Sequence, residues 1–241
     1  MKEESVIKVT HLYKKFGHFT ANDDLNFDVH KGEIFGFLGA NGAGKTTAMR
    51  ILCGLSVPTS GEVIVAGVDV GKYPEKVKRK IGYMSQKFSL YEDLTIWENM
   101  RLFAGIYGVE RKRFNERGKA LLIELDLWEQ RNRLISSLSL GWKQKLAFMV
   151  AMIHEPQIVF LDEPTSGVDP ITRRQFWEMI YEAASNDVTI FITTHYMDEA
   201  EYCDRVSIMV NGKIEALDSP ARLMDRYEVE SMDKLFVTLT R

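Results

Sequence analysis

The sequence predicts an α/β fold in which helices cover both faces of a parallel sheet. Two observations lead to this prediction. Short, almost fully apolar runs such as "QIVFLDE" (157–163) and "VTIFITTH" (188–195) are typical of buried parallel strands, and they alternate with helical patterns. From about residue 90 to residue 155 the apolar period becomes helical, which indicates an insert of about 65 residues. We expect one compact unit.

Composition is that of an ordinary soluble protein. The 241 residues are 45% hydrophobic and 27% charged, and the net charge of −3 gives no electrostatic reason to expect nucleic-acid binding. Basic runs occur at "KVKRK" (76–80) and "RKR" (111–113). We interpret both as solvated faces, although either could contact an acidic partner or lipid headgroups.

The N-terminal stretch "MKEESVIKV" has no apolar signal-peptide core, so we expect a cytoplasmic protein. The longest apolar stretches, "IFGFLGA" and "LAFMVAMI", are far shorter than the roughly 20 residues that a membrane-spanning helix needs. Cys53 and Cys203 have no metal-like neighbours, and we interpret both as packing residues.

The elements follow in order along the chain. Strands are predicted at 5–9, 25–29, 34–38, 62–68 and 81–86, with a helix after Gly44. The insert contributes helical patterns at 96–108, 117–128 and 143–154. The two apolar strands flank a helix at 172–184, and 205–217 reads as a hairpin with an Asn211-Gly212 turn.

A phosphate-binding loop is predicted at "GANGAGKTT" (39–47), between an apolar strand and a helix. A triphosphate needs many close backbone N–H donors, and glycines let the chain curl around it. Lys45 would lie along the β- and γ-phosphates, the Thr46 hydroxyl would hold Mg²⁺, and the following helix N-terminus would favour the anion. The loop residues expected at the nucleotide are Gly39, Asn41, Gly42, Ala43, Gly44, Lys45, Thr46 and Thr47.

Two carboxylates end the buried strand "IVFLDEP" (158–164). Neighbouring residues of a strand point to opposite faces, so Asp162 and Glu163 should have different tasks. We expect Asp162 to hold Mg²⁺ through its water shell and Glu163 to polarise the attacking water. A solubilising strand cap would also explain the pair, but the upstream phosphate loop disfavours that explanation.

Three further side chains are candidates for the same site. His195 ends the strand "TIFITTH" and Gln86 ends "IGYMSQ", and strand ends of this kind converge on the ligand crevice of an open sheet. His195 could reach the γ-phosphate, or it could be a structural cap. Phe16 in "LYKKFG" could stack on a base, or it could belong to the core.

The stretch "SLSLGWKQKLA" (136–146) predicts the start of a helix, with Ser139 as its candidate N-cap. Gly141 lies there between two large apolar residues, Leu140 and Trp142. A residue without a side chain is needed where another group approaches the backbone closely.

Taken in order, these stretches resemble the ATPase subunit of ATP-binding cassette (ABC) transporters, from about Val6 to Leu239. "LYKKFG" is similar to the adenine-stacking loop, "GANGAGKTT" to Walker A, "YMSQ" to the Q-loop and "IVFLDEP" to Walker B. "SGVD" (166–169) is similar to the D-loop, and "TTHYMDEA" carries the switch histidine.

The resemblance implies a P-loop NTPase (RecA-like) core with a small antiparallel β subdomain and an inserted α-helical subdomain. The implied division of the single domain is 1–88 and 157–220 for the core, 89–156 for the helical subdomain and 221–241 for a tail. It also implies a catalytic role for Gln86, which would contact Mg²⁺ as well, and a nucleotide contact for Asp169.

In this family the stretch at 136–146 is the signature motif, Leu-Ser-Gly-Gly-Gln, which faces the ATP held by a second subunit. Ser139 and Gly141 would carry that contact. The sequence departs from the motif at Leu140 and Trp142. Leu140 fits only at negative φ, and we expect both bulky residues to pack in the helical subdomain or the dimer interface.

The resemblance thus implies a cytoplasmic ATPase subunit, peripheral on the inner face of the membrane, that powers export. ATP would close it onto a second such subunit, and separate transmembrane permease subunits would dock near Gln86 and the helical insert. The alternative is a soluble ABC protein acting on ribosomes or chromosomes, which would carry a second cassette with a basic linker, or a coiled coil.

Two further classes of protein fit the sequence less well. A small P-loop kinase would not need the long helical stretch between Lys45 and Asp162, and a cassette that only binds ATP would not need Glu163 and His195.

Overall fold

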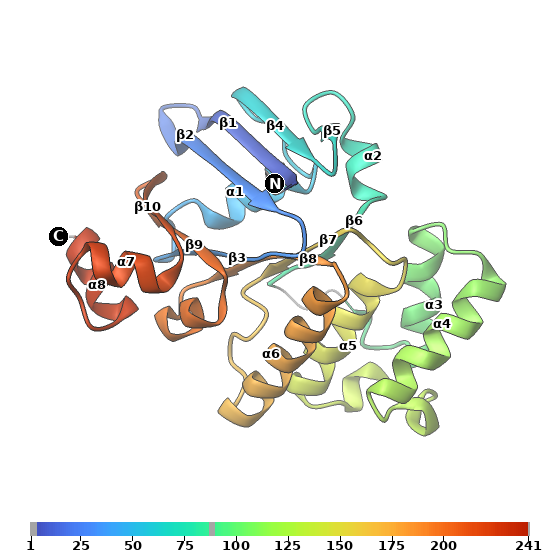
Figure 1. Cartoon of the computed structure of the whole chain (residues 1–241). Coiled ribbons are helices and arrows are strands. Elements are labelled where there is room, and N and C mark those ends of the chain that lie inside the picture. The colour runs from blue at the N-terminus through green and yellow to red at the C-terminus, as the bar shows by residue number, and fades with distance from the viewer. Residues whose placement is uncertain (1–3, 87–89, 241) are drawn as a thin grey trace.

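A computed structural model describes residues 4–86 and 90–240, and two sheets form its frame (Figure 1). The first sheet is antiparallel, with the order β2-β1-β4-β5. Its strands are β1 (Ser5–Phe16), β2 (Phe19–His30), β4 (Ser60–Val65) and β5 (Val68–Asp69). The second sheet has the order β10-β9-β3-β8-β7-β6. Its strands are β3 (Ile34–Gly39), β6 (Ile81–Met84), β7 (Ile158–Asp162), β8 (Thr189–Thr194), β9 (Arg205–Val210) and β10 (Lys213–Asp218).

The second sheet is parallel except at its β9–β10 edge. Every residue of β3, β7 and β8 is buried, which is why these strands read as continuous apolar runs rather than alternating ones. The predicted α/β fold with a covered parallel sheet is confirmed. Because the strands are parallel, β3, β6, β7 and β8 all end at the same edge.

The main helices lie on both faces of the parallel sheet. α1 is packed between the two sheets, α5 and α6 cover the other face, and α3 and α4 of the insert pack beyond α5 (Figure 1). α2 lies beside β5, and α7 and α8 lie at the β10 edge. The helices are α1 (Lys45–Leu52), α2 (Pro74–Lys78), α3 (Ile96–Ile106), α4 (Arg111–Glu124), α5 (Leu140–Met152), α6 (Pro170–Ser185), α7 (Pro220–Arg226) and α8 (Met232–Leu239). Short 3-10 helices are η1 (Trp128–Gln130), η2 (Ile135–Ser137) and η3 (Met197–Tyr202).

Two apolar clusters hold these layers together. Between the sheets, Phe27, Phe35, Phe37 and Phe191 contact one another with ring centroids 5.2–6.2 Å apart. The other cluster continues from the parallel sheet through α5 and α6 into α3 and α4, so the insert shares its core with the rest of the chain. The division at residues 88, 156 and 220 stays a prediction.

Several predicted elements need correction. The single strand expected at 62–68 is broken into β4 and β5 by a turn at Ala66 and Gly67, both at positive φ. The helix expected at 117–128 is α4, which begins and ends earlier, at 111–124. The last helix of the insert begins before 143, at Leu140. The hairpin is confirmed, since Asn211 and Gly212 both have the positive φ of a tight hairpin turn.

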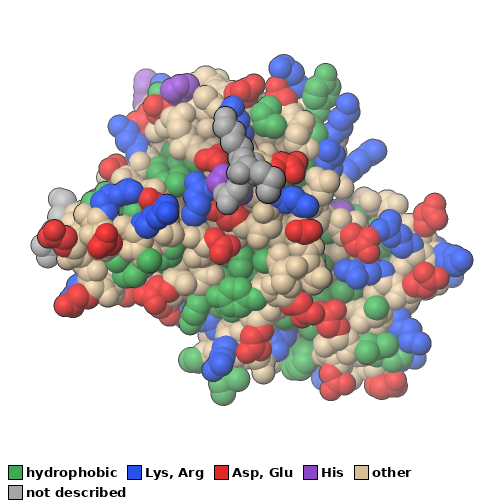
Figure 2. All heavy atoms as spheres, in the orientation of Figure 1, with side chains coloured by type: hydrophobic (Ala, Val, Ile, Leu, Met, Phe, Trp, Pro, Cys, Tyr) green, Lys and Arg blue, Asp and Glu red, His purple; other side chains and the backbone are tan. Residues whose placement is uncertain are grey.

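Acidic and basic side chains are intermixed over the face seen in Figure 2, as the small net charge leads one to expect. Cys53 and Cys203 are buried free thiols, which confirms their assignment as packing residues. Within residues 4–86 and 90–240, no helix combines the length and apolar character that crossing a bilayer requires.

Candidate nucleotide site

The phosphate loop joins β3 to α1, and its backbone shape depends on glycine. Gly39 and Gly44 have φ values of 154° and 101°, which side chains rarely adopt. A Cβ on Gly39 would lie 2.5 Å from the Met209 carbonyl oxygen, and one on Gly44 would lie 2.2 Å from that of Ala21. Conformation and close packing therefore both require glycine at these positions.

Neighbouring strands hold the loop in place. Asn22 of β2, which is fully buried, donates from Nδ2 to the Gly44 carbonyl at 3.1 Å. The amide of Gly212, in the β9–β10 turn, donates to the Ala43 carbonyl at 3.1 Å. Asn22 could not be predicted from the sequence, because a buried asparagine inside a strand belongs to no motif.

The outer part of the loop is open to solvent, where a ligand can reach it. Asn41, Gly42 and Thr46 are exposed, Thr47 is half-buried and Ala43 is buried. The first backbone N–H groups of α1 have no partner within the helix, and no side chain caps its N-terminus. The start of α1 is thus suited to an anion.

Lys45 is only 4% exposed, and its ammonium lies across the loop. Nζ donates to the carbonyls of Gly39 at 2.7 Å and Ala40 at 3.1 Å, and it lies 3.7 Å from Glu163 Oε1. Burial lowers the pKa of Lys45, and the charges of Glu163 and Asp162 oppose that shift. The ammonium is therefore held at the loop by oxygens on both sides.

Asp162, the last residue of β7, is buried and faces the hydroxyls of two threonines. Its Oδ1 accepts from Thr193 Oγ1 at 2.5 Å and from Thr46 Oγ1 at 3.4 Å. Burial raises its pKa, and the Thr193 hydrogen bond acts in the opposite direction. Thr193, on β8, is a second residue that the sequence did not reveal.

Glu163 faces a different set of groups. Gln86 donates from Nε2 to Glu163 Oε2 at 2.9 Å, and His195 Nδ1 lies 3.0 Å from the same oxygen. Glu163 has φ of 48°, and its amide donates to the Thr193 carbonyl at 3.1 Å. The carboxylate of Glu163, just beyond β7, is therefore surrounded by Gln86 from beyond β6, His195 from beyond β8 and Lys45 of α1.

Phe16 lies at the end of β1 and is 56% exposed, so it does not belong to the core. Lys14 Nζ lies 4.9 Å from its ring centroid. The large exposed fraction is compatible with contact to a ligand.

The signature stretch begins at the exposed end of α5. Ser139 occupies the N-cap position of α5 as predicted, but its side chain makes no capping hydrogen bond. Leu140, 45% exposed, and Trp142, 36% exposed, do not pack into the helical insert. Of the two alternatives expected, this exposure disfavours the helical insert, and packing of both side chains in a dimer interface stays a prediction. Leu140 is expected to fit only at negative φ. It is helical and is not among the residues at positive φ.

The structure adds a reason for Gly141 that the sequence did not reveal. A Cβ there would lie 2.4 Å from Thr172 Cγ2, so glycine lets α5 pack against the start of α6.

Asp169 caps α6. Its Oδ1 accepts hydrogen bonds from the amides of Ile171 and Thr172, and its Oδ2 accepts one from Thr172 Oγ1 at 2.6 Å. These bonds, led by that of the Thr172 hydroxyl, lower the pKa of Asp169. Asp169 is thus the N-cap of α6, and its contact with a nucleotide stays a prediction.

A phosphate loop, an acid pair at the end of the nearby strand β7, and inserted helices define a P-loop ATPase of the cassette type. A family model described as "ABC transporter" matches residues 22–166, which is more than half of the chain. The chain belongs to the ABC transporter family.

The similar curated proteins are named as ATP-binding proteins. The chain is 46% identical to "Probable multidrug ABC transporter ATP-binding protein YbhF" of Escherichia coli, over 98% of this chain but only 42% of that protein. It is 32% identical to "Linearmycin resistance ATP-binding protein LnrL" of Bacillus subtilis, over 97% of this chain and 75% of that protein. The chain thus spans less than half the length of YbhF.

Solved structures agree with the fold. One titled "Structure of ATP binding subunit of ABC transporter" superposes with a TM-score of 0.87 at 30% identity, covering 98% of this chain and 100% of that one. Another, "Dimeric Structure of MJ0796, a Bacterial ABC Transporter Cassette", gives 0.79 at 26% identity, covering 88% and 98%.

Proposed function

We propose that this chain is the ATP-hydrolysing, nucleotide-binding subunit of an ABC export system. The observation that carries the proposal is the convergence of Lys45, Gln86 and His195 on Glu163 beside the phosphate loop. An acid in that position can receive a proton from water, while a buried ammonium beside it compensates phosphate charge.

The chain's own groups divide the work. The loop amides and Lys45 would hold the β- and γ-phosphates, and Glu163 would orient the attacking water and accept its proton. His195 and Gln86, which already contact Glu163, would position that water and the γ-phosphate. Phe16, with its exposed ring, would stack on the base.

Oxygen donors fit a Mg²⁺ ion at one point of the site. Thr46 Oγ1 and Asp162 Oδ1 lie 3.4 Å apart, and hydroxyl and carboxylate oxygens are what this hard cation prefers. Gln86, held at Glu163, could add a carbonyl oxygen. When bound, Mg²⁺ would neutralise charge on the β- and γ-phosphates.

The start of α5 supports a site shared between two subunits. The N-terminus of α5 has no side-chain cap, and Leu140 and Trp142 beside it are exposed. A second copy could therefore bring its ATP to Ser139 and the amide of Gly141. The dimeric cassette among the similar structures supports the pairing of two copies.

The names of the relatives support a role in transport. YbhF and LnrL are named for multidrug transport and linearmycin resistance, which supports a role in export. The export itself would run through separate permease subunits. We place the chain at the inner face of the membrane, held there by those subunits. A ribosomal or chromosomal role is not favoured by any of these similar proteins.

Replacing the proposed base tests the assignment. Glu163→Gln keeps a carbonyl that can contact Gln86 and His195 but cannot accept a proton, so turnover should fall by about 10²–10⁴. ATP binding, followed by fluorescent-nucleotide titration, should persist. Exposed Glu129→Gln is the control and should hydrolyse ATP normally. A Glu163→Gln rate within a few-fold of that control would assign the base elsewhere.

A further inference from the structure

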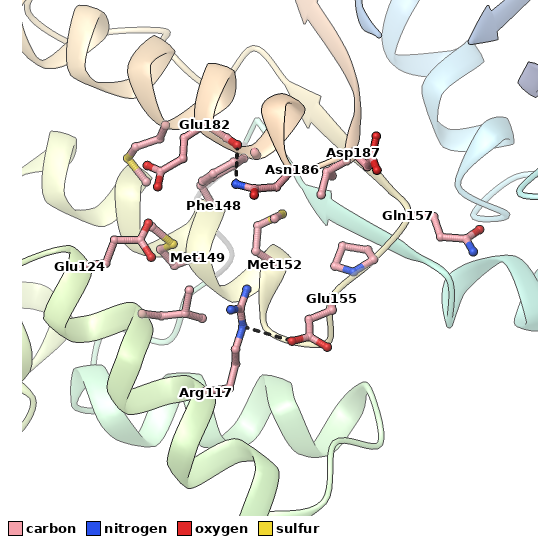
Figure 3. A pocket seen from close by; sticks show the side chains of 15 residues that line it. Arg117, Glu124, Phe148, Met149, Met152, Glu155, Gln157, Glu182, Asn186 and Asp187 are labelled. Carbon is pink, nitrogen blue, oxygen red and sulfur yellow. Dashed lines mark hydrogen bonds and ion pairs between the residues drawn. The ribbon is translucent and has the colours of Figure 1, made fainter. Parts of the chain in front are cut away.

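A cavity of about 550 Å³ lies between α4, α5 and α6, away from the nucleotide site (Figure 3). Its lining includes Gln157, which precedes β7, and Val188, which precedes β8. Glu163 and His195 follow the opposite ends of these same strands. The cavity therefore opens at the far edge of the parallel sheet, and nothing proposed for ATP uses it.

The floor of this cavity is apolar and adaptable. Leu121, Phe148, Met149 and Met152 are buried and line it, and half-buried Met179 adds a third thioether. Methionine side chains are flexible and polarizable, so they can fit ligands of irregular shape. Its volume is in the range of small-molecule sites, about 300–1,000 Å³.

The rim carries negative charge that the protein neutralises only in part. Glu124 of α4 and Glu182 of α6 lie on the same side of the cavity in Figure 3. Burial raises the pKa of Glu124, the charge of Glu182 raises it further, and Arg117 opposes this shift. Among the described residues, neither of these two carboxylates has an ion-pair partner.

The other charges at the rim are already paired. Arg117 Nε lies 3.8 Å from Glu155 Oε1, as the dashed line in Figure 3 marks. Asp187 Oδ2 lies 3.6 Å from Lys31 Nζ. Glu155 is also paired with Arg113, so part of the Arg117 charge is left to act on Glu124. Together with Glu182, which comes from the core helix α6, the rim still keeps a net negative charge.

We propose that this cavity binds a small organic cation, with its ammonium at Glu124 and Glu182 and its apolar body on the methionine floor. Both carboxylates are exposed, so they would attract a cation modestly and would disfavour an anion, whereas a neutral apolar molecule would gain nothing from them. Such a ligand would connect α4 to α6 independently of ATP.

The probe is benzyltrimethylammonium, with benzenesulfonate as an anion of similar ring and size. The chain is labelled with ¹³C at its methionine methyl groups, and the signals are assigned by Met→Leu substitutions. The cation should shift Met149, Met152 and Met179 saturably, and leave Met49 and Met209, buried in the other cluster, unchanged. Benzenesulfonate should bind about tenfold more weakly or not at all.

Charge removal then identifies the rim. Glu124→Gln and Glu182→Gln should each weaken binding of the cation by roughly threefold to fivefold. Glu116→Gln, an exposed acid of α4 outside the lining, is the matched control and should bind as the unmodified protein does.

The proposal fails if the cation does not shift the three methyl groups, or if benzenesulfonate shifts them equally. It also fails if the two Gln variants bind as tightly as Glu116→Gln does. Because the readout is binding without nucleotide, its result is independent of whether the chain hydrolyses ATP.

Discussion

At the scale of single residues, two side chains that shape the nucleotide site belong to no motif. Asn22 holds the Gly44 carbonyl, and Thr193 donates to Asp162 while its own carbonyl accepts from the Glu163 amide. Both are buried inside strands, at positions that the sequence predicts only as part of a sheet. Their role appears once the fold brings distant strands together.

Thr193→Val tests how much the buried hydroxyl matters. Valine has the same shape but leaves Asp162 Oδ1 without its 2.5 Å donor, so we expect a loss of about 1–3 kcal/mol in the free energy of unfolding. Urea denaturation measures it. Thr238→Val, at an exposed helix position, should change stability by less than about 0.5 kcal/mol. Equal losses in both variants would show that the Asp162 bond contributes nothing.

Phe16→Ala tests the base contact. Because the ring is already 56% exposed, its removal should barely affect folding, so a change in affinity reports on the ligand. We expect ATP binding to weaken by about 1–3 kcal/mol, as for a base stacked on an aromatic ring. Tripolyphosphate, which has no base, should bind as before. If both ligands weaken equally, Phe16 does not stack on the base.

At the scale of elements, the helices and strands that the sequence predicts most accurately are those set by a local sequence pattern. The buried strands β3, β7 and β8 are continuous apolar runs, and the phosphate loop lies between β3 and α1 at a fixed motif spacing. The break between β4 and β5 was missed because Ala66, at φ of 49°, is not a typical turn residue.

The start of α4 was missed for a related reason. Its first turn is the basic run Arg111 to Arg113, the N-cap Glu110 makes no side-chain capping bond, and the first buried residue is Phe114. The apolar period therefore begins after the helix does. The contact between Gly141 and Thr172 could not be predicted either, since it joins two helix starts far apart in the sequence.

That contact makes Gly141→Ala informative. The added Cβ would lie 2.4 Å from Thr172 Cγ2, so α5 and α6 must separate slightly, which should cost about 1–3 kcal/mol of stability. Thr172→Ser removes Cγ2 and keeps the hydroxyl that donates to Asp169, so the double variant should recover most of the loss. Thermal or urea unfolding measures both.

The double variant also separates the two reasons for glycine at this position. If ATPase activity stays low once stability has recovered, close approach of a phosphate to Gly141 is the remaining explanation. No destabilisation in Gly141→Ala alone would contradict the packing account.

At the scale of the whole molecule, we expect the phosphate loop and the start of α5 of one chain to serve different ATP molecules, although Leu140 lines a small pocket together with Gln86 and Glu163. The phosphate loop and Glu163 lie at the ends of the parallel strands, whereas Ser139 and Gly141 lie at the exposed start of α5. Within residues 4–86 and 90–240, no hydrogen bond or ion pair joins the phosphate loop to the start of α5. On this account a complete site needs a second copy, with each copy contributing one half to either site.

Mixing two inactive variants tests this arrangement. Ser139→Arg places a bulky cation where a phosphate must approach the start of α5, and Lys45→Ala removes the ammonium of the phosphate loop. Each homodimer should be nearly inactive.

In a heterodimer of the two variants, one interface pairs an intact phosphate loop with an intact signature stretch, while the other interface carries both defects. ATPase activity of the mixture should therefore exceed the sum of the separate variants, at concentrations or with membrane partners that support dimers. Trapped nucleotide counted per heterodimer should approach one, which identifies the intact interface even if turnover needs both sites. Full activity of Ser139→Arg alone would show that the start of α5 does not contact ATP.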